Sequence, residues 1–143
     1  MIYIWLNAVP ILIAAGLGFA FGAVWYQGFA TSWRRAAAVE GTPSADPRIL
    51  IVTFAAEAWL AAILAGALIL MPDQAPLWVM TTMTPLIIWG GFVLPTTLVN
   101  HRFQGRPWRL TIIDGGHWLG VMVIQAITMQ LIGLSAPPGQ GYP

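Results

Sequence analysis

The segment from Met1 to Trp33 contains no charged side chain. Within it, residues 2–26 are long and apolar enough to cross the roughly 30 Å hydrocarbon core of a bilayer as a helix. Over the whole chain, hydrophobic residues make up 58% and charged residues 8%. That is too little charge to cover the surface of a water-soluble fold. The sequence therefore predicts an all-α integral membrane protein.

The 143 residues contain four apolar stretches. We expect these stretches to form one membrane domain, 1–143. The expected transmembrane helices cover residues 2–28, 49–71, 77–99 and 110–134, and the longer connections are loops at 30–48 and 100–109. No basic residue precedes the first stretch, which also exceeds the apolar core of a signal peptide, so we expect it to be retained.

Helix signals in the connections support these limits. Asp46 and Pro47 suit the N-cap and the first turn of the second helix. In the loop at 30–48, Thr31 or Ser32 can cap a short interfacial helix over 33–39. We expect Gly41 and Pro43 to end that helix.

The arginines predict the orientation. All six fall in the two longer connections, and the positive-inside rule places both connections in the cytoplasm. These cytoplasmic basic residues are Arg34, Arg35, Arg48, Arg102, Arg106 and Arg109. We therefore expect an antiparallel four-helix bundle with both termini on the outer side of the membrane. Tryptophans near both interfaces fit this placement as anchors: Trp5, Trp25, Trp33, Trp78 and Trp108.

Three ionisable residues fall inside the expected spans, where such groups are costly enough to be functional candidates. Glu57 lies roughly 13 Å beyond Arg48, and His117 roughly 12 Å beyond Arg109, at about 1.5 Å per helical residue. The two side chains can therefore lie at the same depth and form a proton-relay, ion-binding or hard-metal site, with Asp114 one turn nearer the cytoplasm. Alternatively they form a buried polar pair.

Asp114 has a structural interpretation of its own. It suits the first turn of its helix and can meet Arg109 or Arg106. His101 is an additional ligand candidate or a solvated loop residue. No closed metal motif occurs, so we predict no metal site and no catalytic residue. Cysteine and lysine are absent, which excludes thiolate and Schiff-base chemistry.

Prolines mark a second candidate region in the third span. Pro95 frees a backbone carbonyl one turn earlier, and Thr96, Thr97 and Asn100 can satisfy it. Broken membrane helices often form binding sites, although proline is also ordinarily tolerated there. Three tryptophans at middle depth, namely Trp59, Trp89 and Trp118, either pack or contact a lipid or pigment. No cofactor is predicted.

Several segments resemble one bacterial membrane family. Gly22-Ala23-Val24-Trp25-Tyr26 closes the first helix, and Trp89-Gly90-Gly91-Phe92-Val93, Gly105-Arg106-Pro107 and Asp114 with Gly116 follow in order. Together they are similar to the family catalogued as domain of unknown function 1761. His117 departs from the pattern, because an aromatic residue is more usual there. The resemblance implies a small bacterial inner-membrane protein and no particular activity.

Three functions remain open. The first is a non-catalytic accessory subunit of a larger membrane complex, of photosynthetic or respiratory type, that packs through small-residue and tryptophan-rich helix faces. The second is a small proton-coupled transporter or channel-like homo-oligomer that uses Glu57, His117 and Asp114. The third, least favoured, is an interfacial enzyme. The expected partners are membrane lipids and other membrane subunits or further copies, and no nucleic acid.

Overall fold

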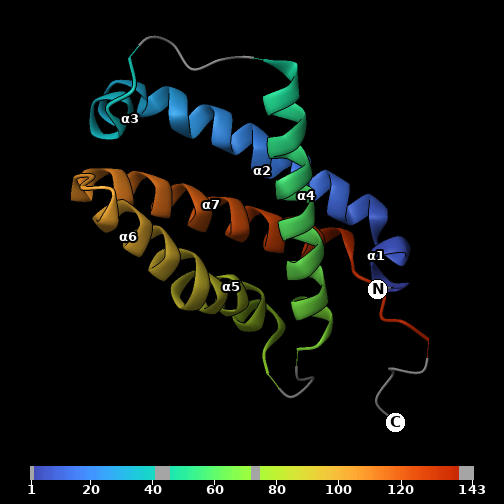
Figure 1. Ribbon diagram of the computed structural model, residues 1–143. Helices are drawn as coiled ribbons and strands as arrows, with labels where there is room; N and C mark the ends of the chain where they lie inside the picture. Colours follow the sequence, from blue (N-terminus) through green and yellow to red (C-terminus); the bar gives the residue numbers. More distant parts are fainter. Residues whose placement is uncertain (1, 41–45, 72–74, 139–143) are drawn as a thin grey trace.

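The computed structural model describes residues 2–40, 46–71 and 75–138, and the described residues form helices and connecting turns without any strand. The elements in chain order are α1 (Ile2–Leu6), α2 (Ala8–Gly28), α3 (Ala30–Ala37), α4 (Pro47–Ile69), α5 (Leu77–Ile88), the π-helix η1 (Trp89–Val93), α6 (Leu94–Phe103) and α7 (Trp108–Ile132). Helices α2 and α7 lie along each other, α4 crosses them steeply, and α5 and α6 flank the other side of α7 (Figure 1).

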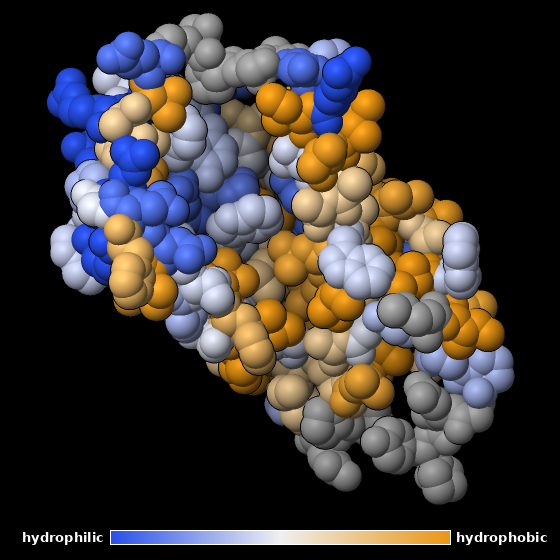
Figure 2. All heavy atoms as spheres, in the orientation of Figure 1, coloured by the Kyte–Doolittle hydropathy of each residue, from blue (hydrophilic) through white to orange (hydrophobic). Residues whose placement is uncertain are grey.

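Within the described residues, four helical segments are long and apolar enough to cross a membrane. They are Ala8–Gly28, Pro47–Ile69, Leu77–Phe103 and Trp108–Ile132. These segments indicate a multi-pass membrane protein, as the sequence predicts. Hydrophilic residues gather at one end of the molecule, over α3 and the turn from α6 to α7 (Figure 2).

The first expected helix is broken. Asn7 separates α1 from α2, three residues before Pro10, which has no N–H to donate to the carbonyl of Leu6. The Asn7 side chain at this break binds the segment after α7, because its amide nitrogen donates to the carbonyl of Ser135 over 2.9 Å. The backbone N–H of Ser135 donates back to the Asn7 amide oxygen over 2.7 Å.

Helix α4 begins where the sequence places a cap. The Asp46 side chain accepts a hydrogen bond from the backbone N–H of Arg48 over 2.8 Å, and Pro47 is the first helical residue. The short helix in the same connection is α3, which starts at Ala30 and ends at Ala37, followed by Ala38 in the left-handed conformation with φ of 52°. Gly41 and Pro43, its expected end, lie outside the described residues.

The loop expected at 100–109 is shorter than predicted. Helix α6 continues to Phe103 and α7 starts at Trp108, so residues 100–103 are helical. The helix ends where Gly105 adopts φ of 65°, a left-handed conformation that glycine adopts without strain. The backbone N–H of Arg106 then donates to the carbonyl of His101 over 2.9 Å. Gly105 and Pro107, rather than Asn100, therefore stop the third span.

The third span changes its winding in the middle, at η1. Trp89 and His101 are twelve positions apart and would face about 120° away from each other in an unbroken helix of 3.6 residues per turn. A π turn accommodates one extra residue. As a result both side chains face α7, where the indole N–H of Trp89 donates to the carbonyl of Gly115 over 2.8 Å and His101 lies 3.5 Å from Asp114.

Glycines bring α2 and α7 into close contact. A Cβ added at Gly120 would overlap the Phe21 ring, and one at Gly116 would lie 3.0 Å from Trp25. In the opposite direction, a Cβ at Gly22 would lie 2.8 Å from the His117 imidazole. Gly116 and Gly120 lie four residues apart on one face of α7, and small residues at this spacing pack the two helices within the chain.

Candidate intramembrane site

Glu57 lies on the inner face of α4. Its neighbours on this face, Ala61, Leu64 and Ala65, are almost fully buried, and Glu57 itself is 2% exposed. The carboxyl oxygen Oε2 lies over Gly18 of α2, because a Cβ built there would be 3.1 Å from it. This oxygen is buried and has no hydrogen-bond partner. A polar atom in that state is unusual in a folded protein and indicates a functional role or an additional bound group.

His117 lies on the face of α7 that meets α2 and is 5% exposed. Its Nε2 atom fits over Gly22, and its Nδ1 atom is buried without a hydrogen-bond partner. The imidazole packs among aromatic rings, with its centroid 4.7 Å from that of Tyr26 and 4.9 Å from that of Trp118. The ring is therefore held by packing rather than by hydrogen bonds to both nitrogens.

The structure places Glu57 and His117 at neighbouring positions along α2 and in the lining of one cavity. Their common depth in the membrane stays a prediction. They lie over Gly18 and Gly22, which are four residues and about 6 Å apart along the axis of α2. No direct hydrogen bond joins them in the described structure. Gln125, one further polar residue of α7, reaches the same place, since its amide donates to the backbone carbonyl of Glu57 over 3.3 Å. A carboxyl and an imidazole so arranged can each take up and release a proton.

Both side chains face one cavity of about 790 Å³. It lies between α2, α3, α7 and the N-terminal half of α4, and it is visible as a hollow beside α4 (Figure 2). Its lining is mainly apolar and aromatic: Phe19, Gly22, Ala23, Tyr26, Ala30, Trp33, Arg34, Ile49, Leu50, Thr53, Glu57, His117 and Trp118. A concave, largely apolar cavity with a few convergent polar groups is the usual form of a small-molecule site.

Asp114 belongs to a separate polar cluster next to this cavity. One of its carboxyl oxygens accepts hydrogen bonds from the Tyr26 hydroxyl over 3.0 Å and from the Trp33 indole over 2.9 Å. The other lies 3.5 Å from Nε2 of His101. The expected pairing with Arg109 or Arg106 is wrong, because α3 folds back over the start of α7, and Arg109 donates to Ser32 of α3 instead.

His101 is therefore part of the protein interior at the end of α6 rather than a solvated loop residue. Its Nδ1 atom lies 3.0 Å from the Thr111 hydroxyl, which also accepts from Arg102 over 3.1 Å. Within the described part of the chain, no group of three or more His, Asp or Glu side chains lies close enough to hold a metal ion.

The other predicted regions do not join the cavity. Pro95, Thr96 and Asn100 are exposed, and the Thr96 hydroxyl donates to the carbonyls of Phe92 and Val93 rather than to that of Gly91. Pro95, Thr96 and Asn100 point outward because the opposite face of the third span, with Trp89 and His101, packs against α7.

The tryptophans divide in two groups. Trp5, Trp78 and Trp108 are more than half exposed, and Trp59 is 55% exposed on α4. Trp25 is half-buried and donates its indole N–H to the carbonyl of Ile113 over 3.1 Å. Its place at the membrane interface stays a prediction. Of the three tryptophans expected at middle depth, only Trp118 lines the cavity.

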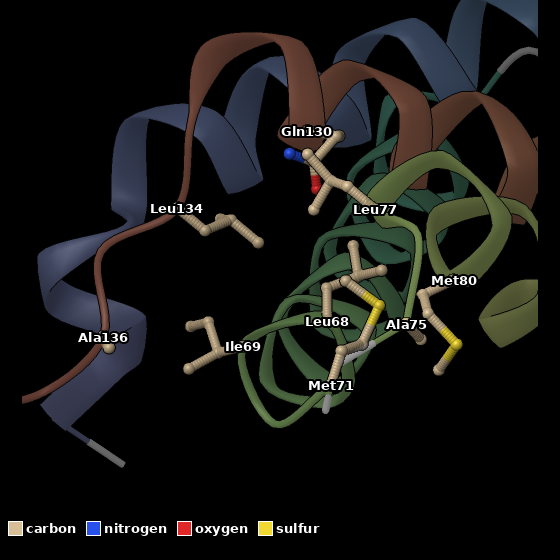
Figure 3. A pocket seen from close by; sticks show the side chains of 9 residues that line it. All are labelled: Leu68, Ile69, Met71, Ala75, Leu77, Met80, Gln130, Leu134 and Ala136. Carbon is tan, nitrogen blue, oxygen red and sulfur yellow. The ribbon is translucent and has the colours of Figure 1, made fainter. Parts of the chain in front are cut away.

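A smaller cavity of about 290 Å³ lies at the opposite end of the molecule, between the ends of α4 and α7 and the start of α5. Leucine, isoleucine and methionine side chains surround it (Figure 3). Its one polar lining side chain, Gln130, accepts a hydrogen bond from Thr81 over 3.3 Å. Without an ionisable or unpartnered group among its lining residues, this cavity is a weaker candidate.

Sequence reasoning missed the residues that build the cavity around Glu57 and His117. Gly18 and Gly22 belong to a stripe of small residues, but the stripe alone does not show which side chains fill the space above it. The sequence marks Tyr26 as part of a family motif and Arg34 as a cytoplasmic arginine, but it marks neither as a cavity residue. Gln125 shares a face of α7 with His117, which is the one pattern that indicates its position.

Comparison with known proteins gives one finding. The model of the family described as protein of unknown function (DUF1761) matches residues 9–130. No curated protein and no solved structure matches the chain.

Substituting Gly22 tests the close fit of His117. A Cβ at this position would lie 2.8 Å from the imidazole, so we expect Gly22→Ala to lower the free energy of unfolding in detergent micelles by about 1–3 kcal/mol. Gly16→Ala is the matched control, because nothing lies within 4 Å of its added Cβ. In a His117→Ala background the cost of Gly22→Ala should fall. Equal costs for Gly22→Ala in both backgrounds would contradict the contact.

Proposed function

Because the chain belongs to the DUF1761 family, whose description gives no activity, we propose a function from the site itself. The protein is a small proton-coupled transporter or channel-like protein, in which Glu57 and His117 exchange protons within the membrane. Four helices enclose little space, so we propose that it works as a homo-oligomer. The single observation that carries the proposal is that two buried ionisable side chains, each with an unpartnered polar atom, face one cavity.

The cost of burial supports a functional role for both residues. A polar group without a partner in an apolar environment destabilises a fold by about 1–3 kcal/mol, and apolar side chains of similar size would avoid that cost. Leaving Glu57 Oε2 and His117 Nδ1 unsatisfied is consistent with groups that take up a proton, a water or a ligand during a transport cycle.

Asp114 adds a third ionisable side chain to Glu57 and His117, nearer the arginine-rich end of the molecule. Its partner Tyr26 contacts His117, with ring centroids 4.7 Å apart. Tyr26 therefore touches both polar groups. We assign Asp114 a supporting role, because both of its carboxyl oxygens have partners in the described structure.

The membrane placement is part of the proposal. We propose an antiparallel bundle in the bacterial inner membrane, with the arginine-rich end in the cytoplasm and both termini in the periplasm. The proposal draws its support from the six arginines, which all lie in α3, at the start of α4 or around the turn from α6 to α7.

A second function, an accessory subunit of a larger membrane complex, has one specific observation in its favour. The third span is the least covered of the four, with 11% of its most apolar window buried, against 50% in the fourth. In its centre, Gly90 and Gly91 have nothing within 4 Å of an added Cβ. Glycines in a membrane helix allow another helix to approach closely, so this face suits packing against another subunit.

The placement can be tested by single cysteines, because the natural chain has none. We expect Ala136→Cys to react with a membrane-impermeant maleimide in intact cells. Gln104→Cys, in the turn before α7, should react only after the inner membrane is opened. Labelling of Gln104→Cys in intact cells would reverse the orientation.

The transport function can be tested in vesicles that hold the purified protein and a trapped pH-sensitive dye. Under a potassium diffusion potential we expect the wild type to move protons, and Glu57→Gln and His117→Ala to stop the flux. Glu40→Gln is the matched control, because it also replaces an acid by the corresponding amide, but at a position outside the four spans. Unaltered flux in both site variants would refute the assignment.

The accessory function predicts stable partners in the native membrane. Purified in mild detergent, the protein should migrate with other membrane subunits, and Gly90→Leu should release them. Gly16→Leu is the control, since Gly16 has equally open space around it. A protein that purifies without partners would exclude this second function.

A further inference from the structure

The lining of the large cavity combines several aromatic side chains with a single acidic one. Phe19 and Tyr26 come from α2, Trp33 from α3 and Trp118 from α7, and Glu57 is the one acidic residue among the lining side chains that the structure describes. The faces of aromatic rings attract cations, and they do so most strongly where water is excluded. A carboxylate supplies the countercharge that such a cation needs in a low-dielectric site.

Two of these rings are fixed in place before any ligand binds. The Tyr26 hydroxyl and the Trp33 indole both donate to the same oxygen of Asp114, and the two rings meet edge to face with centroids 5.6 Å apart. A wall held in this way loses little conformational entropy on binding. Asp114 is therefore a positioning residue for the aromatic wall, while its own carboxyl oxygens remain occupied.

Resting on the proposed transport function, we infer that the cavity binds a hydrophobic organic cation, with Glu57 as the countercharge and the aromatic rings as the cage. Ile49 and Leu50, which line the cavity at the start of α4, are 51% and 44% exposed. An apolar cation can enter there from the bilayer. This assigns the substrate class of the same site.

Binding and proton movement are linked at one carboxyl. When the cation arrives, the protonated Glu57 releases its proton to water and the carboxylate pairs with the cation, so the site keeps its net charge. When a proton returns, the cation leaves. The other titratable side chains that line the cavity are Tyr26 from α2, His117 from α7 and Arg34 from α3, and none of them is an acid that could replace Glu57 in this exchange at neutral pH.

Arg34 is the alternative to Glu57 as the charged residue that selects the ligand. It lines the cavity from α3, and its Nε donates to the carbonyl of Ala30 over 3.4 Å. If Arg34 rather than Glu57 selected the ligand, the cavity would take a hydrophobic anion. The two cases differ in the sign of one charge on ligands of otherwise equal shape.

The experiment measures binding of tetraphenylphosphonium to the purified full-length protein in detergent by titration calorimetry. Tetraphenylborate, of the same shape and opposite charge, is the matched ligand. We expect the cation to bind more tightly as the pH rises and to release protons into a weak buffer. Glu57→Gln should weaken binding about tenfold or more, whereas Glu40→Gln should not, and Arg34→Gln should leave it equal or tighter.

Three results would overturn the inference. These are tight binding of the anion that Arg34→Gln removes, cation binding unchanged in Glu57→Gln, and cation binding to the wild type without proton release. The last result needs no variant, so it holds even if Glu57→Gln fails to fold. Because the measurement needs no flux, it separates the two proposals. Proton flux without cation binding would refute the substrate class alone, and cation binding without flux would refute transport alone.

Discussion

The close approach of α2 and α7 is the constraint on which the rest of the structure depends. It works in both directions, because Phe21 and Trp25 of α2 fit over glycines of α7 while His117 of α7 fits over Gly22 of α2. In a bilayer, apolar side chains gain little by leaving lipid, so tight packing of small against large residues provides much of the association energy. The same packing encloses a polar side chain between two membrane helices.

One turn of α7, at residues 113–115, also accepts hydrogen bonds from three other elements. Three indole N–H groups from three different elements donate to consecutive residues there: Trp25 of α2 to the carbonyl of Ile113, Trp33 of α3 to the carboxyl of Asp114, and Trp89 of η1 to the carbonyl of Gly115. A tryptophan can bury a large ring and still satisfy its one donor. These bonds fix how α2, α3 and η1 are placed along α7. They lie next to the cavity that His117 lines.

Much of this arrangement could be predicted from the sequence, and the failures have physical causes. Four apolar segments and the Asp46 cap of α4 follow from composition and local chemistry. The expected cap of the short helix by Thr31 or Ser32 is wrong, because α3 already starts at Ala30. Counting residues from the arginines gives Glu57 and His117 a common depth, which stays a prediction. The partners of Asp114 could not be derived, because α3 reaches it from a connection whose direction no periodicity encodes. The hydrogen bond from Trp25 to the carbonyl of Ile113 could not be derived either, because only tertiary packing determines which acceptor a half-buried indole meets.

The π turn at Trp89–Val93 has a consequence for how this segment tolerates changes in length. Deleting one residue from an α-helix turns everything beyond the deletion by about 100° relative to what precedes it. Within η1 the same deletion would convert the wide turn into an ordinary α turn and leave the flanking faces in phase. Trp89 and His101 would both still face α7. A single-residue gap in an alignment is therefore structurally mild at Gly90 or Gly91 and severe one turn away on either side.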